Sequence, residues 1–385
     1  MNLQLTDEQQ AIKQAVRRLA TEKFAPKAAH WDSTYTPPIE NLKILADNGF
    51  TGICYPEEYG GSNLGVLENV LIFEELSRAC ANTAMLLNVT EGAVPRVLLG
   101  MGTDEQRRKY LPKMAKAELL AGWAMSEPNA GSDLGNTQTR AVKDGDHYVV
   151  NGTKLWCSAA QLADFFIIFM RIGEAPGIRG VGAMLVESGT AGMTVGKHLD
   201  MIGLRGTGMA EVVFEEARIP AENLIIPPGR MKDLFTLMAA DRIAGNPPIA
   251  LGIAQAAFTA AVTHLKDRVQ FGKPLIENQG LQWKLADMAL EIEAVRALVY
   301  SAAARTDQYG SVPIYETSMA KIAANEMAVR VTNQAIQLAG SFGLSNEYPF
   351  ERYFRDARGL SIGYGTTEVH RNSIARDIMN GTYVC

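Results

Sequence analysis

The feature that most constrains the fold of this chain is its hydrophobic periodicity, which changes twice along the sequence. Apolar residues recur at three- and four-residue spacing from Leu5 to about Leu119, and again from about Arg230 nearly to the end. Between Ala121 and Leu224 the apolar runs are short, and glycine, asparagine and proline turn signals separate them. We therefore predict helices, then a small β-barrel or sandwich, then long helices that form an antiparallel bundle.

The composition is that of a mildly acidic globular protein, with 37 basic and 42 acidic residues in 385. The net charge of 37 − 42 = −5 disfavours a nucleic-acid partner bound through its phosphates. The four cysteines form no CxxC pair and the five histidines never stand at metal-ligand spacing, so we expect no disulfide framework and no metal site. No apolar run reaches about 18 residues and Met1–Thr21 has no apolar core, so we expect a cytoplasmic protein without membrane insertion.

Three local patterns lead to further expectations. Thr6 followed by Gln9 predicts a capping box at the start of the first helix. Pro247-Pro248 should kink or interrupt the helix that carries Asp241, because prolines remove backbone hydrogen bonds. Arg96, which has apolar neighbours in a helical stretch, is expected to be a solvated charge.

The most specific motif is the loop at residues 125–133, with the sequence MSEPNAGSD. Gly131 permits the close approach of a ligand, and Ser126 and Ser132 offer hydroxyls and free backbone N–H groups. These properties suit a ligand-binding loop. Taken alone, the same residues also fit a polar turn between two strands.

Four more segments follow in order, namely Lys154–Ser158, Arg268–Lys273, Gln337–Ser341 and Gly365–Glu368. With all five segments in place, the sequence closely resembles the acyl-CoA dehydrogenase family of flavoproteins over essentially its whole length. The resemblance implies FAD as the cofactor and a mainly α fold with a central β-domain. It also implies three domains: an N-terminal α-helical domain over 1–120, a middle β-barrel over 121–229 and a C-terminal four-helix bundle over 230–385.

The resemblance assigns roles to individual positions. Trp156 corresponds to the aromatic residue that packs on the isoalloxazine, and Ser158 to the hydroxyl that reaches flavin N5. The residues expected to bind FAD are Met125, Ser126, Ser132, Trp156, Ser158, Arg268, Phe271, Gln337, Gly340, Ser341, Thr366 and Glu368. Among them, the residues expected to reach the cofactor of a neighbouring subunit are Arg268, Phe271, Gln337 and Gly340. The residues expected to contact the thioester substrate are Ser132, Arg242, Tyr364 and Gly365.

The catalytic base is the point at which this chain departs from the family. The usual base is a glutamate immediately before the Gly-Thr of the last motif, and here that position is Tyr364. A phenol with a pKa near 10 is a poor base at neutral pH. Some family members carry the base on the first bundle helix, just before an arginine, and Asp241 precedes Arg242 here. Burial beside the flavin should raise the pKa of Asp241, and Arg242 should lower it.

A third carboxylate, Glu91, corresponds by the same resemblance to the far part of the acyl pocket. Each candidate base also has a structural interpretation. Asp241 would form an ion pair with Arg242 or occupy a solvated helix position, and Glu91 would be a surface charge on a helix.

We therefore predict FAD-dependent dehydrogenation of an acyl-CoA thioester, in which the relocated carboxylate Asp241 removes the α-proton and the β-hydride passes to flavin N5. Two alternatives use the same scaffold. One is a 1,4-elimination from a cyclic enoyl-CoA with Glu91 as the base, and the other is a non-redox elimination of the desulfinase type, which an arginine facing the acyl tail would suit. The acyl carrier is CoA or an acyl-carrier protein. The resemblance also implies electron-transferring flavoprotein as the acceptor and a homotetramer built through the C-terminal bundle.

Overall fold

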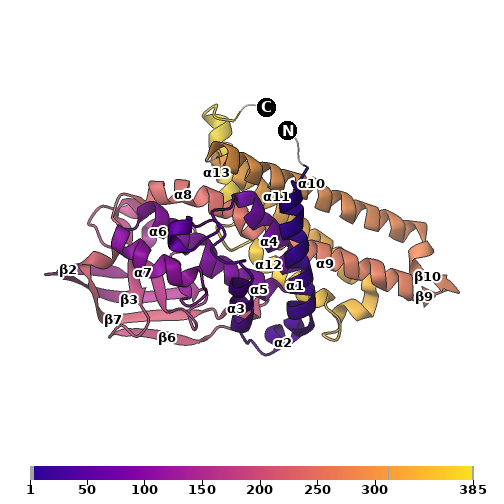
Figure 1. Ribbon diagram of the computed structural model, residues 1–385, viewed down its shortest axis with the longest axis horizontal. Coiled ribbons are helices and arrows are strands. Elements are labelled where there is room, and N and C mark those ends of the chain that lie inside the picture. Colours follow the sequence, from indigo (N-terminus) through magenta and orange to yellow (C-terminus); the bar gives the residue numbers. More distant parts are fainter. Residues whose placement is uncertain (1–3, 311, 384–385) are drawn as a thin grey trace.

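A computed structural model describes residues 4–310 and 312–383, and it confirms a mainly helical fold with a central sheet (Figure 1). The N-terminal and C-terminal helices pack on one another, while the sheet lies at one end of the molecule. The cysteines Cys54, Cys80 and Cys157 are free thiols, and Cys385 lies outside the described residues.

The N-terminal part is built from α-helices joined by turns, by short π- and 3-10-helical segments and by one longer loop between α3 and α4. Their bounds are α1 Asp7–Leu19, α2 Ala28–Ser33, α3 Ile39–Asp47, α4 Val66–Ala79, α5 Ala81–Asn88, α6 Val94–Met101 and α7 Asp104–Met114. The predicted capping box of α1 is confirmed, because the Thr6 hydroxyl accepts from the Gln9 N–H at 3.2 Å and the Gln9 side chain accepts from the Thr6 N–H at 3.0 Å. Between α5 and α6 the chain makes a π-helical turn over Val89–Ala93. Single π-turns are frequent at functional sites, and this one carries Glu91.

The middle of the chain forms one eight-stranded sheet in the order β6-β7-β3-β2-β4-β5-β8, with β1 paired in parallel to β4. The strands are β1 Ala121–Ala124, β2 Arg140–Asp144, β3 His147–Cys157, β4 Phe165–Arg171, β5 Val181–Glu187, β6 Met193–His198, β7 Ala210–Pro220 and β8 Leu224–Ile226. β4 is a continuous apolar run because both of its faces are buried. Phe165 and Ile167 join a cluster that includes α6 and α7, and Phe166 and Ile168 join a second cluster formed by the strands.

The C-terminal part contains the longest helices. They are α8 Met231–Ala244, α9 Asn246–Asp267, α10 Gln279–Tyr309, α11 Ile314–Ala339, α12 Phe350–Leu360 and α13 Thr367–Met379, with a hairpin of β9 Val269–Gln270 and β10 Lys273–Pro274 between α9 and α10. The predicted interruption at Pro247-Pro248 is confirmed. The prolines lie in the first turn of α9. Backbone N–H groups in a first turn have no intrahelical acceptor, so their absence in proline removes no helical hydrogen bond there.

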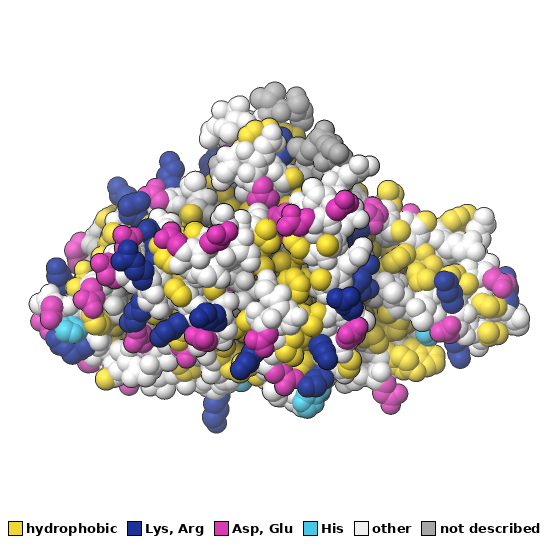
Figure 2. All heavy atoms as spheres, in the orientation of Figure 1, with side chains coloured by type: hydrophobic (Ala, Val, Ile, Leu, Met, Phe, Trp, Pro, Cys, Tyr) yellow, Lys and Arg dark blue, Asp and Glu magenta, His cyan; other side chains and the backbone are white. Residues whose placement is uncertain are grey.

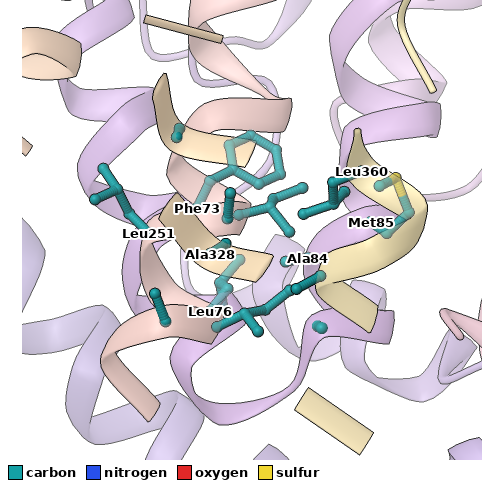
Figure 3. Packing of buried hydrophobic residues seen from close by; sticks show 14 of the residues in the cluster. Phe73, Leu76, Ala84, Met85, Leu251, Ala328 and Leu360 are labelled. Atoms are coloured by element: carbon teal, nitrogen blue, oxygen red, sulfur yellow. The ribbon is translucent and has the colours of Figure 1, made fainter. Parts of the chain in front are cut away.

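The helix α9 lies at the centre of the helical core and contacts both α4 and α11. Figure 3 shows part of this core, in which Phe73 and Leu76 of α4 lie near Leu251 of α9 and Ala328 of α11. The run Met231–Asp267 is long and apolar enough by composition to cross a bilayer, but 61% of its apolar window is buried inside the protein. This burial is what a central core helix requires.

Candidate active site

The carboxylate of Asp241 lies in the last turn of α8, directly before the break that the prolines cause. Its side chain is 1% exposed. It packs against the π-turn, where a Cβ atom on Gly92 would lie 2.9 Å from both Asp241 Oδ1 and Asn88 Oδ1. Glycine at position 92 therefore allows the carboxylate and the amide oxygen to approach the backbone this closely.

Neither oxygen of Asp241 has a hydrogen-bond partner among the described residues. Burial raises the pKa of this carboxyl to about 6, against the opposing effects of the Arg96 and Arg242 guanidinium groups. The directions predicted for burial and for Arg242 are thus confirmed. The Arg242 guanidinium donates to the Thr317 hydroxyl at 3.2 Å. Asp241 is therefore an enclosed carboxylate that remains mostly ionised at neutral pH.

The prediction that Arg96 is a solvated charge is wrong. Its side chain is only 18% exposed, and its Nε atom lies 3.6 Å from Asp241 Oδ1. The reason is tertiary: α6 packs against α8, so this face of α6 is enclosed although the local sequence resembles a surface helix. Two cations therefore act on the candidate base, Arg96 on another helix and its own neighbour Arg242.

Tyr364 occupies the segment between α12 and α13 with φ of 60°, a left-handed conformation that is uncommon for a residue with a Cβ. Its hydroxyl accepts a hydrogen bond from Asn88 Nδ2 at 2.5 Å. Burial, together with the negative charge of Asp241, raises the pKa of this phenol well above 10. Tyr364 is therefore a neutral phenol at neutral pH.

Glu91 is held by hydrogen bonds rather than free at the surface. Its Oε2 atom accepts from the Tyr55 hydroxyl at 2.6 Å and from the Gly52 N–H at 3.0 Å. Burial raises the pKa of Glu91 to about 8, and these two hydrogen bonds lower it only in part. The interpretation of Glu91 as a surface charge is wrong, and at neutral pH the group is mainly the protonated acid.

The segment around Tyr364 is fixed to the bundle by its carbonyl groups. His370 Nε2 lies 3.0 Å from the Tyr364 carbonyl, and Lys321 Nζ donates to the Gly365 carbonyl at 2.7 Å. Burial lowers the pKa of Lys321 to about 8 and that of His370 to about 4. Thr366 caps α13 by accepting from the Val369 N–H at 3.3 Å. The exposed Glu368 lies in the first turn of the same helix.

The motif loop at 125–133 is attached to β3 by a buried ion pair that the sequence does not reveal. Lys154 Nζ lies 2.7 Å from Glu127 Oε1 and also donates to the Met125 carbonyl at 3.1 Å. The Leu155 N–H donates to the Ser126 carbonyl at 3.0 Å. These contacts hold the first two motifs side by side. Within the loop, Ser132 is exposed.

The surface beside this loop fits a flat aromatic cofactor. Trp156 is 50% exposed and has φ of 61°, at a point where the pairing of β3 with β7 is irregular. The irregularity turns an indole ring outward from the sheet, next to Ser158, which bridges to Trp123. An exposed indole with hydroxyls and loop N–H groups around it suits the isoalloxazine assigned to Trp156 and Ser158.

The remaining expected FAD residues lie elsewhere. Phe271, at the tip of the β9–β10 hairpin, is 97% exposed, and Arg268 stacks over Phe342 at 5.4 Å. Figure 1 shows this hairpin at the opposite end of the molecule from the sheet. Gln337, Gly340 and Ser341 at the end of α11 are exposed as well. One chain does not bring these residues together with Trp156.

The half of the molecule that carries the hairpin exposes many hydrophobic side chains (Figure 2). Large exposed examples on this half are Phe271, Trp283, Leu290 and Leu344. An apolar surface of this kind typically marks contact with another protein chain.

Comparison with known families gives three matches that follow one another along the chain. Residues 6–118 match the N-terminal domain of acyl-CoA dehydrogenases, residues 122–217 the middle domain and residues 245–379 the C-terminal domain.

Individual relatives agree with these matches. The chain is 38% identical over 378 residues to the short-chain specific acyl-CoA dehydrogenase of Clostridium acetobutylicum. The match covers 98% of this chain and 100% of the relative. The chain is also 37% identical over 388 residues to the 3-sulfinopropanoyl-CoA desulfinase of Variovorax paradoxus, covering 97% of this chain and 95% of that protein.

Solved structures are equally similar. The butyryl-CoA dehydrogenase of Megasphaera elsdenii has a TM-score of 0.94 and 35% identity, covering 98% of this chain and 100% of that one. A structure reported for the electron transferring flavoprotein of Acidaminococcus fermentans has a TM-score of 0.94 and 36% identity with the same coverage.

Proposed function

The chain belongs to the acyl-CoA dehydrogenase family, whose members are FAD flavoproteins that oxidise CH–CH donors, and we propose that Asp241 is the base of its reaction. The substrate is a saturated acyl-CoA thioester. Asp241 takes the α-proton at a carboxylate oxygen, and bound FAD supplies the acceptor for the β-hydride at its N5.

A single observation carries this proposal: Asp241 is a buried carboxylate whose oxygens have no hydrogen-bond partner among the described residues. A buried carboxylate that makes no hydrogen bond to the described residues, and only a long contact of 3.6 Å with Arg96 Nε, is costly to retain, so its presence supports a use for its free lone pairs. A pKa of about 6 leaves most of the group ionised at neutral pH, near the value that suits a general base.

The other groups of the cluster support this assignment. Tyr364, which occupies the position of the usual glutamate, is a neutral phenol whose oxygen is held by Asn88. Glu91 is mainly protonated at neutral pH and has one oxygen tied to Tyr55 and Gly52. Neither group is prepared to accept a proton there.

The cofactor would lie against Trp156 and Ser158 of one chain and against Arg268, Phe271 and Gln337 of a second copy. The exposure of Phe271 and the separation of the hairpin from the sheet support this arrangement. We therefore propose a homotetramer assembled through the C-terminal bundle. We further propose a cytoplasmic location and electron-transferring flavoprotein as the electron acceptor.

The test of this function is anaerobic titration of the FAD-loaded protein with saturated acyl-CoA thioesters. We expect loss of the oxidised flavin absorbance and release of the enoyl product. Two results would favour the alternatives instead. Oxidation of a cyclic enoyl-CoA alone would favour the 1,4-elimination with Glu91, and turnover of a β-sulfinyl thioester without flavin bleaching would favour the non-redox elimination.

A further inference from the structure

Asn88, the last residue of α5, has a buried amide whose two ends have different surroundings. The residue is 1% exposed. Its Nδ2 atom donates to the Tyr364 hydroxyl at 2.5 Å, whereas its Oδ1 atom has no hydrogen-bond partner among the described residues. A buried amide oxygen without a donor destabilises the folded protein, so a state in which a donor reaches it is favoured.

The free oxygen of this amide faces an oxygen of the candidate base. Asn88 and Gly92 are four residues apart, so they lie on the same face of the helical segment. The position that a Cβ atom on Gly92 would occupy lies 2.9 Å from Asn88 Oδ1 and also 2.9 Å from Asp241 Oδ1. The two oxygens are therefore at most twice this distance apart, and residue 92 places no side chain between them.

The neighbouring backbone holds the amide in this orientation. A Cβ atom on Gly245, at the break between α8 and α9, would collide with the Asn88 amide, so the backbone packs directly on that group. The nitrogen end is fixed by the Tyr364 hydroxyl. The Tyr364 segment is fixed in turn, because His370 contacts the Tyr364 carbonyl at 3.0 Å. The Asn88 oxygen is thus an immobile acceptor beside Asp241.

Two acceptor oxygens cannot bond to one another while Asp241 is ionised, because a carboxylate has no hydrogen to donate. A carboxyl group that carries a proton is a donor, and the Asn88 oxygen then has the partner that it otherwise lacks. The two unpartnered oxygens are therefore satisfied together in one protonation state of Asp241, the state that follows proton uptake.

We infer that Asn88 is a positioning residue for the base: its amide oxygen accepts a hydrogen bond from Asp241 once that carboxylate has taken up the substrate proton, and Tyr364 orients the amide for this contact. The inference deepens the proposed function and rests on it, since it names the residue that stabilises the base in its proton-bearing form.

The contact forms during the proposed proton transfer. The α C–H bond of the thioester breaks, its proton bonds to an Asp241 oxygen, and its electron pair forms the C=C bond as the hydride leaves the β-carbon for bound FAD. The new O–H group of Asp241 then donates to Asn88 Oδ1. A hydrogen bond to the neutral form of an acid raises its pKa, so Asn88 makes Asp241 a stronger base.

The charged groups that face Asp241 act in the opposite direction. Burial raises the Asp241 pKa, and the guanidinium groups of Arg96 on α6 and Arg242 on α8 lower it. Cys54 and Tyr364 also face Asp241, and burial raises the pKa of both, so they are neutral at neutral pH.

The remaining titratable groups nearby act on the two cations or are held elsewhere. Asp307 of α10 interacts with Arg96, and Lys321 of α11 with Arg242. Glu91 of the π-turn is held by its own hydrogen bonds. A substitution of the amide changes none of these groups, so a change in the pKa of the base reports the loss of the amide itself.

The test measures the pKa of Asp241 without turnover, from the infrared carbonyl band of its protonated carboxyl in the FAD-loaded protein. Asp241→Asn identifies the band by its absence. We expect the pKa in Asn88→Leu to be about 1 lower than in wild type, an approximately 10-fold loss of proton affinity, which is the scale of one hydrogen bond. Tyr364→Phe keeps the amide and releases its nitrogen end, so it should lower the pKa by less.

The matched control is Asn82→Leu, on the same helix. Asn82 is 2% exposed, and its Oδ1 atom accepts from the Gly206 N–H at 2.9 Å. This substitution removes a buried amide hydrogen bond away from the base, so it should reduce stability and leave the Asp241 pKa unchanged. If Asn88→Leu does not fold, Asn88→Ala, which adds no bulk beside Gly245, takes its place with the same expected fall.

An Asp241 pKa that is unchanged or higher without the Asn88 amide would overturn the inference. A rise is the result that an amide nitrogen facing the carboxylate would give. An equal fall in Asn82→Leu would also overturn it, because the effect would then be a general loosening of α5.

Flavin reduction by a saturated acyl-CoA separates this inference from the proposed function. If the pKa falls as expected but the thioester never bleaches the flavin of wild type, the proposed function fails and the pairing of Asn88 with Asp241 is retained. If the flavin is bleached and the pKa is unchanged in Asn88→Leu, only the role of Asn88 fails.

Discussion

Replacing Asp241 by asparagine is expected to stabilise the folded protein while removing its activity. The side chain is 1% exposed, and neither oxygen has a hydrogen-bond partner within residues 4–310 and 312–383. Asparagine keeps the shape of the side chain and removes its charge. The change in the free energy of unfolding therefore measures how much the buried charge destabilises the folded protein.

The magnitude follows from the pKa. Burial raises the pKa of Asp241 from 3.8 to about 6, so the folded state binds this proton more tightly than the unfolded chain does. Ionisation of the group therefore opposes folding, by an amount that grows as the pH rises from about 4 to about 6 and is constant above that. A difference of about two pKa units corresponds to a gain on the order of 3 kcal/mol for Asp241→Asn at pH about 7.

The assay is urea denaturation of wild type and Asp241→Asn, both loaded with FAD, at about pH 4.5 and at about pH 7.5. The variant should be more stable at the higher pH, and its advantage should shrink at the lower pH because wild-type Asp241 is then protonated. Asp233→Asn in the first turn of α8 is the control, since that carboxylate is 52% exposed. A variant less stable than wild type at pH 7.5, or an advantage independent of pH, would refute the reasoning.

Two further substitutions test the geometry of the site. Gly92→Ala would place a Cβ 2.9 Å from the Asp241 and Asn88 oxygens. We therefore expect flavin reduction by a saturated acyl-CoA to slow about 10- to 100-fold. The control is Gly280→Ala, whose Cβ would meet nothing within 4 Å and which should leave the rate unchanged. Phe271→Ser should leave the stability of the single chain within about 0.5 kcal/mol, because Phe271 is 97% exposed there, but should reduce the FAD retained per subunit. Light scattering and flavin absorbance test Phe271→Ser. An FAD-saturated monomer of wild type or of Phe271→Ser would contradict the shared cofactor site.

The parts of this fold that the sequence predicts are those set by local chemistry. The capping box of Thr6 and Gln9 depends on residues three apart, and the break before α9 depends on the missing N–H groups of Pro247-Pro248. The apolar run that becomes β4 is also visible, although only the structure shows that α6 and α7 cover one of its faces.

The surroundings of the base could not be predicted in the same way. Arg96 and Asp241 are far apart in the sequence and meet only because α6 packs on α8. The ion pair of Lys154 with Glu127 likewise joins two motifs whose sequences contain no sign of the contact. A helix with apolar neighbours has the same local pattern whether its charged residue faces solvent or another helix, so pattern alone placed Arg96 incorrectly.

The central claim, that Asp241 is the base, is tested most directly by the rate of flavin reduction after rapid mixing with a saturated acyl-CoA. The wild-type rate should rise with pH through about 6, the pKa of the carboxylate that must be ionised. Asp241→Asn should slow reduction by about 100-fold or more and remove this dependence, whereas Glu91→Gln and Tyr364→Phe should change the rate far less. Reduction that survives in Asp241→Asn and is abolished in Glu91→Gln would contradict the claim and would assign the base to Glu91.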